Sequence, residues 1–204
     1  MSARSPLGRA ATGSPSKKRA RREGRTIIFL DETGHSFRAR PGATWARRGV
    51  TPVLRRLSKR REVCSVVAVT PAGRLYARHV RGSVSSRVVT RALRHFRRKI
   101  GRPLLIVWDR LNAHRARRTA AFLARHARDF AVAYLPAYLP ACAPDLNPEE
   151  PCNAWVKRAM ENALPRDVAD LGQLVRRAFR RLQHRADFII GCFRHAGLRI
   201  TQLP

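Results

Sequence analysis

The sequence predicts an α/β fold in which one mixed sheet lies between two layers of helices. Short apolar runs rich in β-branched residues, typical of buried strands, occur at residues 26–30, 62–69, 104–108 and 130–135. Amphipathic helical patterns lie before and between the last two runs, and a strand–helix–strand unit with short links favours a right-handed parallel crossover. The first runs are separated only by turns and loops, so we expect them to pair antiparallel. One sheet with both strand directions follows.

The antiparallel part begins with the strand at residues 26–30. Residues 44–53 contain apolar and turn-forming residues, which we interpret as an edge strand with a turn. The run at 62–69 is followed by a Pro-Ala-Gly turn at 71–73 and a return strand at 74–79. These segments together predict a ribbon beside the first strand.

The helices are predicted from apolar residues at spacings of three and four. Residues 85–100 form the clearest case, with Arg and Lys on the opposite face and Gly101 and Pro103 ending the helix. Its apolar face consists of Val88, Val89, Ala92, Leu93, Phe96 and Ile100. Further helices are expected at 116–127, 170–182 and 187–198. They provide enough apolar surface to cover both faces of the sheet.

The charge of the chain indicates a polyanionic partner. The 204 residues fit one domain, predicted at 26–204, and carry a formal net charge of +30. Residues 1–25 are expected to be a disordered basic tail, with three roles left open: holding DNA phosphates, nuclear import, or a solvated leader without a partner. Its candidate DNA-binding residues are Lys17, Lys18, Arg19, Arg21 and Arg22. A basic composition without a nucleic-acid role is the alternative.

The cysteines and the hydropathy pattern favour a cytosolic protein. The four cysteines, Cys64, Cys142, Cys152 and Cys192, form no CxxC pair. A zinc knuckle is therefore not indicated, and we expect reduced thiols that fill the core. No apolar run reaches the roughly 18 residues that a membrane-spanning helix needs, so no membrane span is predicted.

Two aspartates follow apolar strands in a chain that has few acids. Asp31 and Asp109 each stand one residue beyond a predicted strand, where the reacting groups of open α/β sheets gather. If the strands are neighbours, the two carboxylates repel unless a cation neutralises them. Oxygen ligands favour Mg²⁺ or Mn²⁺, and two such ions suit phosphodiester chemistry. The alternative for each residue is an ordinary turn or capping role.

A third carboxylate is expected from the phrase Asn147-Pro148-Glu149-Glu150. Asn as N-cap, Pro at the first position and Glu at the third are typical of a helix start. Glu150 is the candidate for the site, with a purely structural capping box as the alternative. Glu149 is expected to point about 100° away from it and to serve only the helix dipole.

The phrases FLDETGHS, TWARRGVTPVL, LLIVWDRLNAH and YLPACAPDLNPEE resemble the catalytic domain of DDE transposases. The match is best with the bacterial insertion-sequence branch of the mariner superfamily, over residues 26–198. The resemblance implies a ribonuclease-H-like three-layer fold and two Mg²⁺ or Mn²⁺ ions held by Asp31, Asp109 and Glu150. It places three further residues near the site, Glu32, His114 and Asn147. It also adds Arg47, Arg48 and Lys157 to the residues expected to bind DNA.

The resemblance implies an endonuclease that cuts DNA at the transposon end and then joins the freed 3′ end to target DNA. Its partners would be double-stranded DNA, a second copy of the chain in a homodimer, and a helix-turn-helix region on a separate polypeptide. The expected location is the bacterial cytoplasm, with the nucleoid. For His114, a helix-capping or core role is the alternative.

Three departures from the family pattern leave a second hypothesis open. The chain has no helix-turn-helix ahead of residue 26, the phrase Tyr-Leu-Pro-Ala occurs twice within residues 134–141, and Asn153 stands where the family often has Trp. A truncated, catalytically inactive remnant that only binds DNA is therefore the first alternative. A basic RNA-binding protein is the second, although aromatic residues make up only 7% of the chain and suit base stacking poorly.

Overall fold

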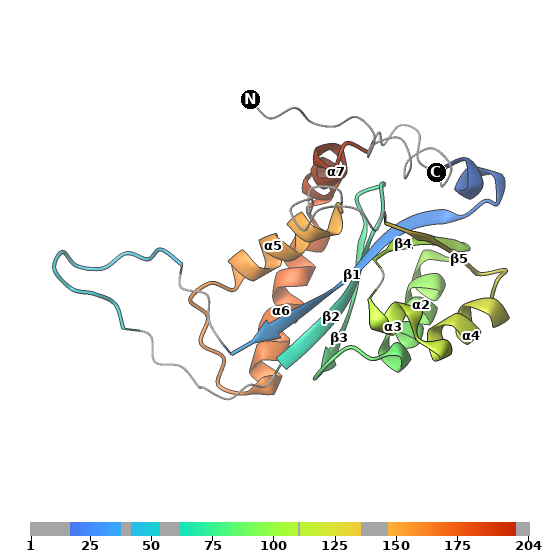
Figure 1. Cartoon of the computed structure of the whole chain (residues 1–204). Coiled ribbons are helices and arrows are strands. Elements are labelled where there is room, and N and C mark those ends of the chain that lie inside the picture. The colour runs from blue at the N-terminus through green and yellow to red at the C-terminus, as the bar shows by residue number, and fades with distance from the viewer. Residues whose placement is uncertain (1–16, 38–41, 54–61, 110, 136–146, 199–204) are drawn as a thin grey trace, which may run out of the picture.

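Five strands form one mixed sheet in the computed structural model, which describes residues 17–37, 42–53, 62–109, 111–135 and 147–198 (Figure 1). The strand order is β3-β2-β1-β4-β5. The strands are β1 Thr26–Ser36, β2 Glu62–Val69, β3 Leu75–Arg81, β4 Leu104–Trp108 and β5 Phe130–Tyr134. The first three pair antiparallel, and β4 and β5 run parallel to β1. Order and directions confirm the predicted ribonuclease-H-like sheet.

The first strand is longer than predicted and changes partner along its length. Its beginning pairs with β4, up to the pair Phe29 and Val107, whereas residues 29–36 pair with β2. The apolar run stops at Leu30, so polar residues were expected to lie in a loop. Hydrogen bonding to β2 instead continues the strand through Asp31 and beyond, which shows tertiary pairing overriding local polarity.

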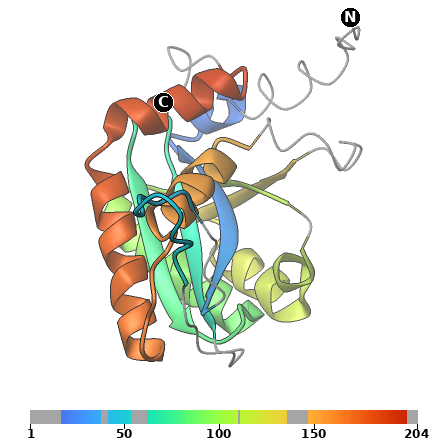
Figure 2. The same ribbon diagram turned by 90° about the vertical axis from the view of Figure 1, so that its left-hand side faces the viewer.

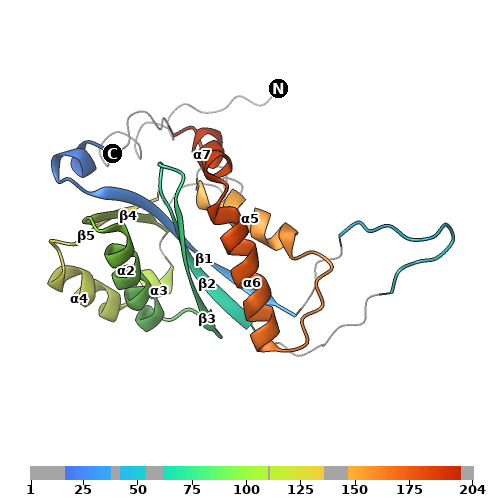
Figure 3. The same cartoon turned by 180° about the vertical axis from the view of Figure 1, so that it is seen from behind.

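Helices cover both faces of the sheet (Figures 1 and 3). One layer contains α2, α3 and α4, and the other contains α5, α6 and α7. Their bounds are α2 Ser86–Ile100, α3 Asn112–Arg115, α4 Arg117–Arg125, α5 Glu149–Ala159, α6 Val168–Gln183 and α7 Ala186–His195. The short α3 was not predicted as a separate helix, since its four residues are too few for a periodic pattern.

Strand alternation divides the core between the two layers. Leu105 and Val107 of β4 belong to the cluster under α5, α6 and α7, whereas Leu104, Ile106 and Trp108 belong to the cluster under α2 and α4. All five residues of β4 are buried, which fits its central place in the sheet. The predicted apolar face of α2 is buried at Val89, Ala92, Leu93 and Phe96. The left-handed Gly101 (φ 78°) ends that helix, as predicted.

The basic segment before β1 is helical over residues 17–22, so the predicted disordered tail is wrong for this part. Ala20 is fully buried against the core, and Glu23 accepts a 3.0 Å hydrogen bond from Nε of Arg19. One buried alanine and a local ion pair hold a helix that composition alone did not suggest. Residues 1–16 lie outside the described residues.

Residues 42–53 extend away from the sheet as an irregular segment (Figures 1 and 2). The predicted edge strand at 44–53 is therefore wrong, although the predicted turn is present, with the Val50 amide donating to the Arg47 carbonyl at 3.0 Å. Trp45 is fully exposed. The apolar residues that suggested a strand face solvent, so no core fixes them in extended pairing.

Three cysteines lie within the described residues, and each is buried: Cys64, Cys152 and Cys192. They form no disulfide, as predicted. Cys142 and most of the repeated Tyr-Leu-Pro-Ala phrase lie outside the described residues. None of the described helices is long and apolar enough to cross a membrane.

Candidate active site

Asp31 lies inside β1, at the point where the parallel pairing with β4 ends. It is opposite Val67 of β2, and its Oδ1 accepts a 2.8 Å hydrogen bond from the Glu32 amide. Burial raises the pKa of the Asp31 carboxyl to about 6, and the charges of Glu32 and Asp109 act in the same direction. Asp31 is thus buried beside other carboxylates, where a negative charge on its own carboxyl is unfavourable.

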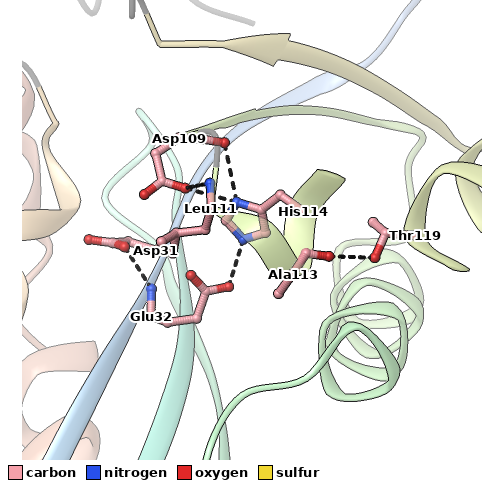
Figure 4. A network of polar contacts seen from close by, with 7 residues as sticks. All are labelled: Asp31, Glu32, Asp109, Leu111, Ala113, His114 and Thr119. Carbon is pink, nitrogen blue, oxygen red and sulfur yellow. Dashed lines mark hydrogen bonds and ion pairs between the residues drawn. The ribbon is translucent and has the colours of Figure 1, made fainter. Parts of the chain in front are cut away.

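Asp109 directly follows β4, as predicted. Asp31 and Asp109 each lie two residues beyond the last pair of the β1–β4 ladder, Phe29 and Val107. The charge of Asp109 acts to raise the pKa of Asp31, so the two carboxylates are close enough to interact. Figure 4 shows them side by side. The structure therefore brings together the two aspartates that the sequence singled out.

His114 of α3 links Asp109 to Glu32, whose side chain lies on the opposite face of β1 from Asp31. Its Nε2 lies 2.8 Å from Oε1 of Glu32, and its Nδ1 lies 2.9 Å from Oδ1 of Asp109 (Figure 4). Carboxylate oxygens accept from both ring nitrogens, which is the arrangement of an imidazolium. Burial acts to lower the pKa of His114, but the bonds to Asp109 and Glu32 outweigh it and raise the pKa to about 9.

The position of His114 is fixed by packing as well as by charge. Its ring stacks on Trp108, with ring centroids 4.1 Å apart and an angle of 7° between the planes. Thr119 supports the short helix by donating to the Ala113 carbonyl at 2.7 Å. Burial acts to raise the pKa of Asp109, but hydrogen bonds from His114 and the Leu111 amide leave it below the ordinary value. Asp109 is therefore a carboxylate at neutral pH.

Glu149 is the residue that sequence reasoning placed wrongly. It is fully buried in the first turn of α5, hydrogen-bonded to Asp31, and its Oε2 accepts a 2.7 Å bond from Nδ2 of Asn153. Burial raises its pKa well above the ordinary value, and the charge of Asp31 adds to this effect. A protonated Glu149 can donate to the Asp31 carboxylate, so it does more than serve the helix dipole.

A helical pattern in the sequence could have placed Glu149. The buried face of α5 consists of Glu149, Cys152, Asn153 and Val156, at the spacing of an inward-facing helix stripe. Glu150 is half-buried in the same turn. Asn147 lies just before the helix, and its side chain accepts a 3.1 Å bond from the Glu149 amide. The predicted capping contact is therefore present, although α5 begins at Glu149, one residue later than predicted.

Two carboxylate oxygens near the aspartates are buried and receive no hydrogen bond from an N–H group or a hydroxyl of the described residues: Oε2 of Glu32 and Oε1 of Glu149. Buried oxygens of this kind are costly unless a proton or a cation meets them. Within the described residues, no three metal-ligating side chains converge on one point, because Asp31 is bonded to Glu149 and Asp109 to His114. The donors suit Mg²⁺ or Mn²⁺, and holding an ion requires these side chains to exchange partners.

The predicted DNA-binding residues are not gathered around the aspartates. The helix at 17–22 precedes β1, and Asp31 lies about 16 Å along that strand from its first residue. Arg47 and Arg48 are exposed in the projecting segment, whereas Lys157 lies two turns along α5 from Glu149. Only Lys157 shares an element with the candidate site.

Comparison with known proteins assigns the family. The DDE superfamily endonuclease family matches residues 26–172, which include every carboxylate of the candidate site. The chain belongs to the DDE superfamily endonucleases. Among curated proteins, no match is found.

Solved structures agree with this family at the level of the fold. The pre-cleavage Mos1 transpososome superimposes with a TM-score of 0.56 at 16% identity, covering 86% of this chain and 58% of that one. The Mos1 transposase paired-end complex with left transposon end gives 0.55 at 16% identity, covering 89% and 59%. The Mos1 mariner paired-end complex with Mn gives 0.52 at 18% identity, covering 86% and 58%. This DDE endonuclease chain thus spans less than two thirds of those transposases.

Proposed function

We propose that this chain is the catalytic domain of an insertion-sequence transposase, which cuts DNA at transposon ends and transfers the strands to target DNA. The observation that carries the proposal is the approach of two carboxylates at the end of the β1–β4 ladder: Asp31 and Asp109 each follow its last pair by two residues, and the charge of Asp109 acts on Asp31. Membership of the DDE endonuclease family supplies the class of chemistry.

We assign the divalent ions to Asp31, Asp109 and Glu150. When bound, Mg²⁺ or Mn²⁺ would activate the attacking oxygen and stabilise charge on the leaving oxygen of the phosphodiester. The chain surrounds Asp109 and Asp31 with two different electrostatic environments. His114 keeps Asp109 ionised and fixed, whereas Glu149 shares a hydrogen bond with Asp31, a carboxyl that burial makes harder to ionise. Ion binding would compete with the proton held between Asp31 and Glu149.

The test is metal-dependent nicking of supercoiled plasmid by the purified chain. Mg²⁺ or Mn²⁺ should support nicking, and Asp109→Ala should abolish it because an oxygen ligand is lost. Asp129→Ala is the matched control, since it removes an acid that pairs with Arg97 at 2.8 Å, outside the site. Nicking that survives Asp109→Ala would exclude the assignment.

A second candidate is a DNA-binding remnant without turnover. The observation that favours it is the buried bond between Glu149 and Asp31, which occupies a carboxylate that the ions need. This function predicts salt-sensitive DNA binding that Asp109→Ala leaves unchanged, and no metal-dependent product. Assay of cleavage and binding on the same preparations separates the two functions.

The active assembly is proposed to contain two copies of the chain on DNA in the bacterial nucleoid. Two of the similar solved structures, both of Mos1 transposase, are described as a paired-end complex and a strand transfer complex. A separate helix-turn-helix polypeptide would recognise the end sequences for this chain. Light scattering of the chain with and without end-containing duplex should reveal a dimer only with DNA, and a stable monomer on DNA would count against it.

A further inference from the structure

The two helix layers differ sharply in charge. Residues 86–129, which include α2, α3 and α4, contain thirteen Arg and Lys but two acids. One of these acids is Asp109 in the site, and the other, Asp129, bonds Arg97 at 2.8 Å. Residues 149–198, which include α5, α6 and α7, contain nine Arg and Lys and six acids. A solvated basic face would not by itself explain why one layer is nearly free of acids.

The exposed arginines of α2 form a continuous stripe. Four of them stand at helical spacings of four, three and four: Arg87, Arg91, Arg94 and Arg98. The stripe is about 16 Å long, since each residue adds about 1.5 Å. B-DNA carries roughly ten phosphates over that length, counting both strands. Four cations in one row therefore have a regular array of anions to match.

Helix α4 widens the stripe into a surface. The guanidinium carbon of Arg94 lies 4.9 Å from the ring centroid of Phe122, which joins α2 to α4. Arg117, Arg118 and Arg125 of α4 are exposed, and Figure 3 shows the two helices side by side on the same face of the sheet. The cations of both helices thus belong to one rigid surface.

The surface lacks the groups that other polyanions would require. Among the described residues of α2 and α4, no large apolar side chain is exposed. Insertion into a lipid surface needs such anchors, and single-stranded nucleic acid needs aromatic rings for base stacking. The phosphate backbone of a duplex needs only positive charge at the right spacing.

We infer that the outer face of α2 and α4 is a second binding surface for duplex DNA, separate from the carboxylate site. It holds phosphates without reading sequence. The inference relies on the proposed function for the choice of DNA as partner, but not on turnover. A chain that cuts one duplex while holding a neighbouring stretch has a physical use for such a surface.

The test compares two triple variants with the same loss of charge. Arg87, Arg91 and Arg98 are replaced by Gln on α2, and the exposed Arg177, Arg180 and Arg181 are replaced by Gln on α6 as the control. Binding of a labelled duplex is measured by fluorescence anisotropy between about 50 and 200 mM salt. The α2 variant should lower the slope of log affinity against log salt by about 3, so the loss of affinity across this range shrinks about 40-fold. The α6 variant should change the slope by less than about 1.

Three outcomes would overturn the inference: equal effects of the two variants, no change in slope, or tighter binding of RNA duplex or single strands than of DNA. Asp31→Asn tests independence, because it should remove nicking and leave the α2 effect intact. Loss of nicking in this variant therefore does not contradict the second DNA-binding surface. If the α2 variant melts early by circular dichroism, phenylglyoxal labelling of the unsubstituted chain decides: DNA should protect Arg91 and Arg98 more than Arg177 and Arg181.

Discussion

The α2–α4 layer and the α5–α7 layer pack on the same sheet, yet they meet the acids of β1 with opposite chemistry. From the first layer, His114 reaches Glu32 with a cationic ring. From the second, Glu149 reaches Asp31 with a buried carboxyl. Strand alternation makes this possible, because Asp31 and Glu32 are neighbours that face opposite layers.

The difference shows how one site can hold an ionised acid, Asp109, beside Asp31, an acid that resists ionisation. The hydrogen bond from His114 lowers the pKa of Asp109, whereas burial raises the pKa of Asp31 although its contact with Glu149 acts in the other direction. A metal ion arriving at this place would find one carboxylate ready and would have to displace a proton from the other.

The two layers should contribute equally to stability despite their different charges. Phe96 of α2 and Phe179 of α6 are both almost completely buried. Replacement of either by Ala should lower the free energy of unfolding by about 3–5 kcal/mol, measured by urea unfolding. A loss below about 1 kcal/mol for one of them would mean that its layer is not a cohesive part of the core.

The two glutamates of α5 should differ in their effect on nicking. Glu150→Gln should reduce the rate by more than the roughly 100-fold that loss of an outer-shell partner costs, because it removes a proposed ligand. Glu149→Gln should cost about tenfold, since the amide can still donate to Asp31. Single-turnover rates with Mn²⁺ measure both. The reverse order would transfer the third ligand to Glu149.

The alkaline limit of stability should come from the α2–α4 layer. The pKa of His114 is raised from 6.5 to about 9, so its contribution is complete below pH 6.5 and is lost as pH rises through 9. The metal-free chain should lose about 2 kcal/mol of unfolding free energy between pH 6.5 and about 8.5. His114→Asn should flatten this limb. If the unfolding free energy of the variant fell as steeply between pH 6.5 and 8.5, the loss would belong to other groups, such as thiols.

The acid limit should come from the α5–α7 layer. His35 and His79 bond Ser65 at 3.2 and 2.8 Å under Phe179. Burial lowers the pKa of both histidines from 6.5 to about 4, so their contribution is complete above 6.5 and is lost as pH falls towards 4.

His35→Gln should remove about 1–2 kcal/mol of the decrease in unfolding free energy between pH 6.5 and about 5. The raised pKa of Asp31 acts in the opposite direction over part of this range, so the comparison is made in an Asp31→Asn background. Equal acid slopes with and without His35→Gln would contradict the assignment.

Much of the sheet and its two aspartates were predictable because apolar runs and their ends are local signals. The run at 104–108 gave both the bounds of β4 and the place of Asp109. The extension of β1 past Leu30 was not predictable, since it depends on pairing with residues of β2 that lie between 26 positions (Ser36 and Glu62) and 36 positions (Asp31 and Val67) away in sequence. The projecting segment at 42–53 misled the prediction because its apolar residues have no core to join.

Within the site, the predictions that were wrong or incomplete depend on the orientation of side chains around helix and strand axes. Whether Glu149 or Glu150 faces Asp31 is decided by the rotation of α5, which the packing of Cys152 and Val156 sets. His114 was predicted to lie near the site, but its bridging of two acids requires the β1 alternation that puts Glu32 on its side. The contact between α5 and Asp31 joins distant parts of the sequence, and residues 136–146, which precede α5, lie outside the described part of the chain.

The length of β4 has a consequence for the freedom of the two aspartates. Since the parallel ladder stops at Phe29 and Val107, β1 continues from Leu30 to Ser36 paired with β2 alone. If the ladder continued for two more residues, Asp31 and Asp109 would be held as a strand pair, and their backbones would have less freedom to adjust to an arriving ion. The short apolar run that ends at Trp108 therefore sets how independently the two acids can move.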